Sequence, residues 1–327
     1  MDVATMASTI DNLAQHEESA GSMPDVVHTC VVSPAFAEDR VVLSGRDSGI
    51  WRSDDGGSSF RQVFGPATPG QLVTATSIAF APDFPRDPTV TAGIAGAVAR
   101  SSDGGRSWRT VALPDPPPLV TCLSFSPAYE VDGMILAGTL EDGVLRSDDR
   151  GERWRRWNFG LLDLSVYCLA PSPAFAQDET IFAGTETALF KSENGGRSWR
   201  ETPFPEEAPP VLALAVSQHG EIWAGTEQHG LWRSADHGET WQRSGSENIT
   251  QPVNQLDFGE RRALAVLPGA IALADGRGRD WRVAFADLGT DGGVAGVAVP
   301  GGIDAATSLL VQLRNGPVRE LRIRHVN

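Results

Sequence analysis

The chain has 327 residues, of which 41% are hydrophobic, and its 42 Asp and Glu outnumber its 27 Lys and Arg, for a formal net charge of -15. This acidic balance argues against a general nucleic-acid binder, which needs a basic surface, and it suits a basic partner or a bound cation. The 35 Gly and 22 Pro favour many turns, and therefore many short strands, over long helices.

The first segment, residues 1–24, does not resemble the rest of the chain, and we predict it to be a tail. It has no basic start followed by an apolar stretch, so we expect no secretory signal. No apolar run approaches the roughly 20 residues of a membrane-spanning helix, so we expect no membrane partner and a cytoplasmic location. Residues 8–20 are a candidate short helix, since Ser8 or Thr9 can cap it.

From about residue 26 onward, the chain repeats a unit that ends in an eight-residue segment, which we call the box. The first unit contains SPAF (33–36), VVLSG (41–45), GIWRS (49–53) and the box SDDGGSSF (53–60). The later boxes are SSDGGRSW (101–108), SDDRGERW (147–154), SENGGRSW (192–199), SADHGETW (234–241) and ADGRGRDW (274–281). Their closing aromatic residues follow one another at intervals of 40–48 residues.

The box has the composition of a tight turn between two strands. Its Asp or Asn can accept hydrogen bonds from N–H groups of the turn, its Gly can adopt positive φ, its first Ser adds a local hydrogen bond, and its aromatic can pack beneath the turn. We therefore assign the boxes a structural role. The residues with this role are Ser53, Asp55, Gly57, Phe60, Ser101, Asp103, Gly105, Trp108, Ser147, Asp149, Gly151, Trp154, Ser192, Asn194, Gly196, Trp199, Ser234, Asp236, Gly238, Trp241 and Trp281. In the sixth box, Ala274 replaces the Ser and Gly276 replaces the Asp.

A cation precedes five of the boxes, and such regular placement indicates a structural role. We expect it to pack against the box aromatic or to pair with a carboxylate of a neighbouring unit. These cations are Arg52, Arg100, Arg146, Lys191 and Arg233.

Period-2 alternation, with turn residues at every joint, predicts four strands, a to d, in each unit. Tandem four-stranded units of this length are typical of a β-propeller, in which each unit is one antiparallel blade. Residues 294–301, 308–313 and 317–323 predict three further strands without a box. We therefore predict an all-β fold with seven four-stranded blades over residues 25–327, with six blades as the alternative. Residues 1–24 either supply the missing fourth strand and close the ring or form the short helix.

The box resembles the Asp-box, or BNR, repeat, whose pattern is S-x-D-x-G-x-T-W, over roughly residues 26–285. The resemblance places the chain with propellers of WD40/YVTN-like repeats, in the superfamily of sialidases, sortilin-like proteins and photosystem II assembly factors. The resemblance implies that each box fastens the hairpin between strands c and d. It therefore indicates the fold and does not indicate a function. The assembly-factor group binds partner proteins across a charged face, but its arginine patch is not matched here, since the loops are acidic.

In a propeller, the a–b and c–d turns lie on one face, and the b–c and d–a loops lie on the other. The boxes belong to the first, which we call the box face. The second, which we call the loop face, surrounds the channel and holds the substrate in the enzymes that this chain resembles. The candidate binding residues there are Arg46, Asp47, Glu141, Asp142, Trp157, Phe159, Tyr167, Glu186, Glu227 and His229. They suit a cationic or mixed polar–apolar partner, with a merely solvated rim as the alternative.

The sequence does not show a complete catalytic site. A sialidase needs three arginines and a Tyr–Glu pair, whereas the b–c loops offer only Arg46, and Tyr129 falls in a turn of the box face. Asp47 with Glu186 is the carboxylate pair that we consider for glycoside chemistry. The six His residues lack zinc-binding spacing and no nucleotide fingerprint is present, so we expect no metal and no cofactor.

The sequence thus predicts a monomeric, non-catalytic propeller that acts as an interaction or assembly scaffold for a protein partner through its loop face. The alternative is a glycan-binding or glycoside-hydrolysing propeller, for which the sequence identifies no catalytic residues.

Overall fold

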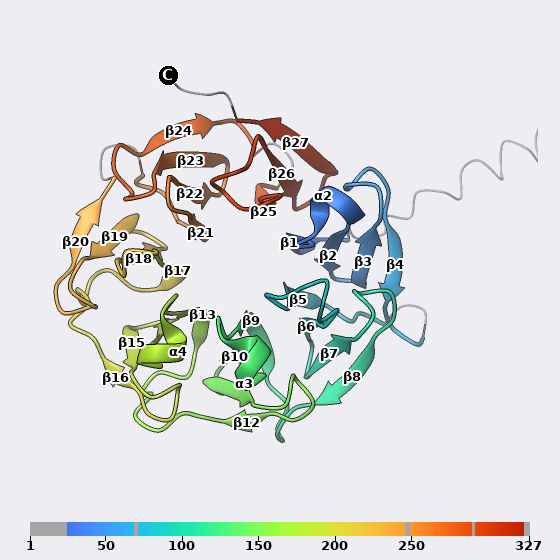
Figure 1. Cartoon of the computed structure of the whole chain (residues 1–327), viewed down its shortest axis with the longest axis horizontal. Coiled ribbons are helices and arrows are strands. Elements are labelled where there is room, and N and C mark those ends of the chain that lie inside the picture. The colour runs from blue at the N-terminus through green and yellow to red at the C-terminus, as the bar shows by residue number, and fades with distance from the viewer. Residues whose placement is uncertain (1–24, 69–70, 246–248, 290–291, 324–327) are drawn as a thin grey trace, which may run out of the picture.

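The computed structural model describes residues 25–68, 71–245, 249–289 and 292–323, which form seven small antiparallel sheets arranged in a ring (Figure 1). The predicted seven-bladed β-propeller is confirmed, and the six-bladed alternative is wrong. The helix and the ring-closing strand predicted for residues 1–24 lie outside the described residues. No helix in the described part of the chain is long and apolar enough to cross a membrane.

Each blade is one sheet whose strands follow chain order, a to d, from the central opening to the outer rim (Figure 1). Blades 1 to 3 contain β1 (Val27–Val32), β2 (Val42–Arg46), β3 (Gly49–Ser53) and β4 (Arg61–Phe64); β5 (Ala75–Phe80), β6 (Val90–Ile94), β7 (Ala97–Ser101) and β8 (Arg109–Ala112); and β9 (Leu119–Phe125), β10 (Ile135–Leu140), β11 (Val144–Ser147) and β12 (Arg155–Arg156).

Blades 4 to 6 contain β13 (Val166–Pro171), β14 (Ile181–Thr185), β15 (Leu189–Ser192) and β16 (Arg200–Glu201); β17 (Val211–Val216), β18 (Ile222–Thr226), β19 (Leu231–Ser234) and β20 (Gln242–Ser244); and β21 (Gln255–Phe258), β22 (Arg262–Leu267), β23 (Ala270–Asp275) and β24 (Arg282–Phe285). Blade 7 contains β25 (Val294–Ala298), β26 (Ser308–Leu313) and β27 (Val318–Arg322). It therefore has three strands in the described part of the chain, where the other blades have four.

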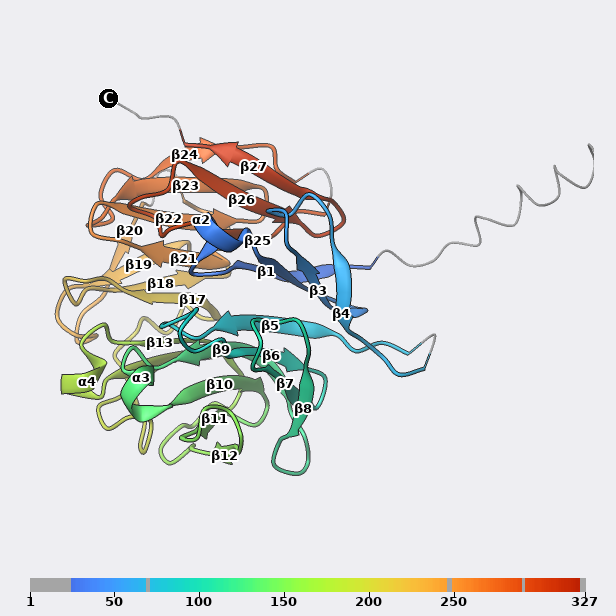
Figure 2. The ribbon, with the colours of Figure 1, turned by 45° about the vertical axis from the view of Figure 1, so that its right-hand side comes forward.

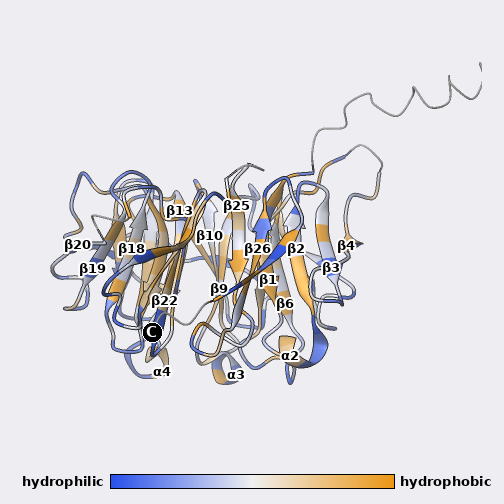
Figure 3. Cartoon of the chain, turned by 90° about the horizontal axis from the view of Figure 1, so that it is seen from above, coloured by the Kyte–Doolittle hydropathy of each residue, from blue (hydrophilic) through white to orange (hydrophobic). Residues whose placement is uncertain are grey.

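The a–b turns of three blades contain a single helical turn that the sequence analysis did not predict. These are α2 (Phe36–Asp39), α3 (Tyr129–Asp132) and α4 (Phe175–Asp178), and they lie together on the box face (Figure 3). The Ser and Asp of the repeated turn close it, because the Ser33 hydroxyl donates to Asp39 over 2.7 Å and accepts the N–H of Ala35. Asp39 is thus a turn-closing residue, as its equivalents Asp132 and Asp178 are.

The boxes form the predicted turns between strands c and d. In the second box, the Ser101 hydroxyl accepts the N–H of Gly105 over 2.8 Å and donates to Asp103. The other Ser hydroxyls of the five intact boxes accept the equivalent glycine N–H over 2.8–2.9 Å. In the sixth box, the turn shifts by one residue, and Asp275 accepts the N–H groups of Arg277 and Arg279.

Three of the five cations before the boxes connect neighbouring blades. Arg52 and Arg146 donate to the backbone carbonyls of Gly104 and Gly195, each in the box of the next blade. Arg100 does the same to Arg150 and also lies 3.5 Å from the Glu152 carboxylate, so the predicted pairing with a neighbouring carboxylate holds for this residue. By contrast, this prediction is wrong for the other four cations, which pair with carboxylates of their own blades: Arg52 with Asp54, Arg146 with Asp148, Lys191 with Glu193 and Arg233 with Glu221.

The hydrophobic core lies between the blades, so each blade needs its neighbours to bury both faces. One cluster, for example, joins Val98 and Val111 of blade 2 to Ile135, Leu145 and Trp154 of blade 3. The ring closes where β1 of blade 1 contacts β25 of blade 7, and the two strands lie side by side in Figures 1 and 2.

Candidate functional site

The loop face is opposite α2, α3 and α4 (Figure 3), and the ten predicted binding residues lie in its b–c turns, its d–a loops and the adjoining ends of β2 and β13. Their placement is set partly by a β-bulge near the start of strand a, which recurs at Val27/Thr29, Ala75/Ser77 and Val166/Cys168. A bulge re-aims the extra side chain. In blades 1 and 4, the bulged residues are His28 and Tyr167, and both contribute to the loop face.

The two predicted binding residues of blade 1, Asp47 and Arg46, already interact with other residues of the same blade. Asp47 accepts hydrogen bonds from His28 Nε2 over 2.7 Å and from the N–H of Val26, so it fixes the start of β1. The Arg46 guanidinium lies 4.7 Å from the centre of the Trp51 ring. These contacts give both residues a structural role.

In blade 3, the predicted residues separate into held and exposed side chains. Asp142 pairs with Arg156 over 3.0 Å, whereas Glu141 of the same turn is exposed. The Trp157 ring lies beneath Arg146, with 4.2 Å between the guanidinium carbon and the ring centre. Phe159, in contrast, projects into solvent with 80% of its surface exposed. Of the two aromatic residues predicted in this loop, Phe159 is therefore the one whose side chain is available to a partner.

Blades 4 and 5 bring three predicted residues together. Glu186 and Glu227 lie in the b–c turns of blades 4 and 5, and the negative charges of their carboxylates act on the phenol of Tyr167. Burial, followed by the negative charges of Glu186, Asp163 and Glu227, raises the pKa of Tyr167. His229, in the same turn as Glu227, has a buried Nδ1 without a hydrogen-bond partner among the described residues.

The carboxylates of the loop face differ in the hydrogen bonds and ion pairs that they form with the rest of the protein. Asp163 accepts hydrogen bonds from the N–H and hydroxyl of Thr187, over 2.8 and 2.7 Å, and orders the loop. Within residues 25–68, 71–245, 249–289 and 292–323, the carboxylates of Glu141, Glu186 and Glu227 form no ion pair. All three are exposed, so their charge is available to a partner.

Sequence reasoning missed two apolar neighbours of Phe159 in the β12–β13 loop. Leu162 is 81% exposed and Leu164 is 37% exposed, so three apolar side chains of one loop face solvent beside Asp163. The signal was present as Leu161-Leu162-Asp163-Leu164, but only the structure shows that Leu161 of this run is buried while Leu162 is not.

The carboxylate pair considered for glycoside chemistry is not assembled as a site. Asp47 lies in blade 1 and Glu186 lies in blade 4, on the other side of the central opening (Figure 1). Glycosidases place both carboxyl groups across one scissile bond, roughly 5–9.5 Å apart. No group of His, Cys, Asp and Glu that could hold a metal ion occurs among the described residues.

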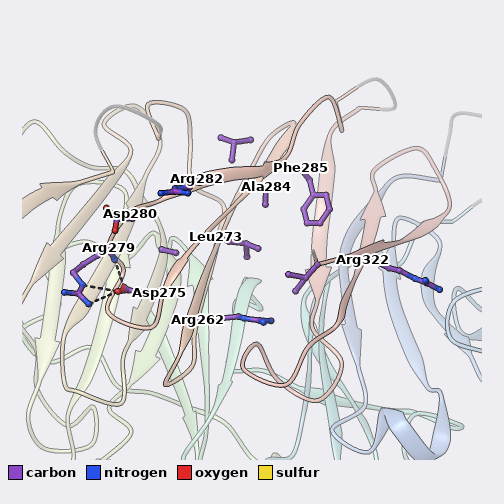
Figure 4. Close-up of a pocket in the computed structure, with 12 residues that line it drawn as sticks. Arg262, Leu273, Asp275, Arg279, Asp280, Arg282, Ala284, Phe285 and Arg322 are labelled. Carbon is purple, nitrogen blue, oxygen red and sulfur yellow. Dashed lines mark hydrogen bonds and ion pairs between the residues drawn. The ribbon is translucent and has the colours of Figure 1, made fainter. Parts of the chain in front are cut away.

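The described surface also contains a groove of about 770 Å³, but it lies away from the loop-face residues, on the outer rim between blades 6 and 7 (Figure 4). Neither the motifs nor the candidate residues of the sequence analysis pointed to it.

No protein-family model and no curated protein matches the chain. Solved structures of other proteins do resemble it. One structure, YCF48 bound to a D1 peptide, is 13% identical with a TM-score of 0.67, and the match covers 92% of this chain and 94% of that one. YCF48 from Cyanidioschyzon merolae is similar at 13% identity and a TM-score of 0.65, covering 92% and 97% of the two chains.

Larger proteins contain the same fold as one part. An ancestral GH74 enzyme is 17% identical with a TM-score of 0.69, and the match covers 93% of this chain but 46% of the enzyme. The extracellular domain of BT4673 from B. thetaiotaomicron, a putative one-component system, is 13% identical with a TM-score of 0.66, covering 94% of this chain and 39% of that one. At these identities, the likeness extends to the propeller fold alone.

Proposed function

We propose that this chain is a non-catalytic propeller scaffold that binds a protein segment carrying cationic and apolar side chains on its loop face. The observation that carries the proposal is that exposed, unpaired carboxylates (Glu186 and Glu227) and exposed apolar side chains (Phe159 and Leu162) occur together in the loops of blades 3 to 5. An acidic rim speeds the encounter with a basic partner and orients it, while buried aromatic and aliphatic contacts supply most of the affinity.

Two features support the loop face as the binding surface and a peptide as its ligand. The box face carries the repeated turns, whose polar groups are satisfied within the turn itself, so it has little to offer a ligand. A similar propeller, YCF48, was solved with a peptide bound, which supports a peptide as the kind of ligand for this fold. In this proposal, the repeated boxes are Asp-box hairpin staples that keep the loop face rigid.

The glycan-binding or glycoside-hydrolysing alternative is supported by the fold of the ancestral GH74 enzyme, of which this chain spans less than half. The positions of Asp47 and Glu186 favour it less, because they occupy different sides of the ring (Figure 1). Turnover of chromogenic glycosides that is abolished by Asp47→Ala or Glu186→Ala would establish it in place of the scaffold.

The test uses a random-peptide library selected against the purified chain. We expect enriched peptides to combine Lys or Arg with Phe, Leu or Trp, and to lose affinity when salt is added, because screening weakens contacts between exposed charges. The double variant Glu186→Lys/Glu227→Lys should bind these peptides more weakly. Glu38→Lys makes the same kind of charge change at an exposed residue of α2 on the box face and should bind like the unaltered chain. Equal binding by both variants would rule out the loop face.

A further inference from the structure

Two Asn-Gly pairs occur in the chain, and the structure places them in different kinds of turn. Asn194-Gly195 is part of the box of blade 4, whereas Asn315-Gly316 lies in the turn between β26 and β27. Asn is a thermally labile residue. A following Gly favours its reaction, because a residue without Cβ leaves its peptide nitrogen open to the preceding side chain. The two pairs therefore have the same chemistry in different surroundings.

The reaction of such a pair is intramolecular and consumes only water. The peptide nitrogen of the Gly loses its proton and attacks the side-chain Cγ of the Asn, and the carboxamide nitrogen takes up a proton and leaves as ammonia. Water then opens the resulting cyclic imide at one of its carbonyls. Opening at Cγ gives aspartate, whereas opening at the main-chain carbonyl gives isoaspartate, in which the chain runs through Cγ. Either product adds a negative charge, and nothing is oxidised or reduced.

In the box of blade 4, both reacting groups are engaged in hydrogen bonds. The Asn194 Oδ1 accepts the N–H of Ser198 over 2.9 Å and the hydroxyl of Ser192 over 3.0 Å, and its Nδ2 donates to the Ser198 hydroxyl over 2.8 Å. Gly195 is buried, and its N–H donates to the carbonyl of Glu179 over 2.8 Å. Attack at Asn194 therefore requires the turn to open first, because the amide and the glycine nitrogen must both lose these bonds.

The turn between β26 and β27 leaves the same groups accessible. The carboxamide of Asn315 is exposed and forms no hydrogen bond with the part of the chain that the structure describes. Among the same residues, the N–H of Gly316 has a single long hydrogen bond, 3.4 Å to the carbonyl of Leu313. The buried Gln312 donates from Nε2 to the carbonyl of Gly316 over 2.7 Å, which fixes the turn but not the side chain of Asn315. Attack at Asn315 therefore needs no opening of the blade.

We propose that Asn315 is a site of spontaneous modification in the folded chain, where it converts to aspartate and isoaspartate, and that the box of blade 4 keeps Asn194 as the amide. The β26–β27 turn is the b–c turn of blade 7, so the reaction adds a negative charge to the loop face. This turn lies across the ring from Glu186 of blade 4 (Figure 1). The proposal does not depend on the proposed function of the loop face.

Incubation of the purified full chain in mildly alkaline heavy-oxygen water tests the proposal, because opening of each cyclic imide incorporates one labelled oxygen. Mass spectrometry of peptides digested in ordinary water locates the label. In the folded chain, we expect label at Asn315 to accumulate at least about tenfold faster than at Asn194, since attack at Asn194 requires local opening. In concentrated urea, where neither turn persists, the two rates should converge. Equal rates in the folded chain, or a difference of the same size in urea, overturn the proposal.

Ser198→Ala tests the protection of Asn194 directly. It removes the hydroxyl that accepts the Asn194 Nδ2–H and leaves the backbone N–H of residue 198 in place. We expect the labelling rate at Asn194 to rise about two- to tenfold, the range of one neutral hydrogen bond, with Asn315 unchanged. Ser107→Ala is the matched control, because it makes the same change in the box of blade 2, where Asp103 has no amide. A rate at Asn194 that both variants change equally contradicts protection by the box.

Methylation by an isoaspartate methyltransferase gives a second measurement that detects the isoaspartate product itself. After incubation, the unaltered chain should accept labelled methyl groups. Asn315→Gln should lose most of this signal, because the longer side chain forms the cyclic imide far more slowly. Asn194→Asp keeps the side-chain oxygen that accepts the N–H of Ser198, and it should retain the signal. A signal that Asn315→Gln retains in full would place the modification elsewhere in the chain and overturn the proposal.

Discussion

Arg100 of blade 2 donates a hydrogen bond from its Nε to the backbone carbonyl of Arg150 in blade 3, over 2.7 Å. Arg150 is the fourth residue of its box and has a φ of 62°, and its equivalents Gly104 and Gly195 have φ values of 75° and 67°. The preceding blade supplies an arginine to each of these carbonyls. The box is therefore both a turn within one blade and a hydrogen-bond acceptor for the blade before it.

Removing this contact should destabilise the ring. Arg100→Met keeps most of the aliphatic volume but leaves the Arg150 carbonyl without its charged donor, and we expect the free energy of unfolding to fall by about 1.5–3 kcal/mol. Urea denaturation measures this free energy of unfolding. Arg155→Met alters an exposed arginine of the same chain and should change stability by about 0.5 kcal/mol or less. Similar losses in the two variants would show that the contact between the blades contributes nothing.

The carboxylate of the fifth box should make stability depend on acid. Hydrogen bonds from the Thr240 hydroxyl, the Thr240 N–H and the Ser234 hydroxyl lower the pKa of Asp236 to about 2. Because the folded pKa is below the unfolded value of about 3.9, this contribution to stability is present above pH 4 and is lost as the pH falls towards 2. Asp236→Asn should make the fall in the denaturation midpoint between pH 4 and 2 shallower.

The reciprocal change is the control, because the fourth box has a natural amide. Asn194 Oδ1 accepts the N–H of Ser198 over 2.9 Å, so an Asn fits the turn without a charge. Asn194→Asp should make the same acid-induced fall steeper. Unchanged pH profiles in both variants would mean that the box carboxylates do not titrate with unfolding.

The fold was predictable because its information is local and repeated. Each intact box contains the residues that close one turn, as Ser101, Asp103 and Gly105 do. Because the boxes recur at a regular spacing, they also mark where each blade that has one lies in the chain. The seventh blade has no box, yet its apolar alternation was sufficient to predict β25, β26 and β27.

The candidate site was less predictable, because it depends on contacts between blades and on loop packing. Nothing in the sequence indicates that the Trp157 ring lies under Arg146, or that Asp47 is occupied by His28. The bulge at Tyr167 is likewise a property of strand register rather than of residue type.

The exposed apolar side chains of the β12–β13 loop should matter for binding and not for stability. Phe159 and Leu162 are 80% and 81% exposed, so the double variant Phe159→Ser/Leu162→Ser should unfold within about 0.5 kcal/mol of the unaltered chain. Its affinity for loop-face peptides should fall about tenfold or more, since buried apolar anchors dominate such interfaces.

Val131→Ser provides the control for that prediction. Val131 is 90% exposed in α3 on the box face, so the change removes apolar surface without touching the loop face. Isothermal calorimetry with one selected peptide compares the variants. A double variant that binds as tightly as Val131→Ser would remove Phe159 and Leu162 from the interface.

The ionisation of Tyr167 reports directly on the acidic cluster. Tyr129→Phe leaves Tyr167 as the sole tyrosine, so phenolate absorbance then follows one group. Burial and the charges of Glu186, Asp163 and Glu227 raise its pKa, and because the folded pKa exceeds the unfolded value of about 10, the associated stability is lost as the pH rises past it. Glu186→Gln/Glu227→Gln should lower the pKa of Tyr167, whereas Glu38→Gln on the box face should not. A bound cationic peptide should lower it as well, because its charge offsets that of the carboxylates. A titration curve that neither the double variant nor the peptide shifts would separate Tyr167 from the acidic cluster and from the binding surface.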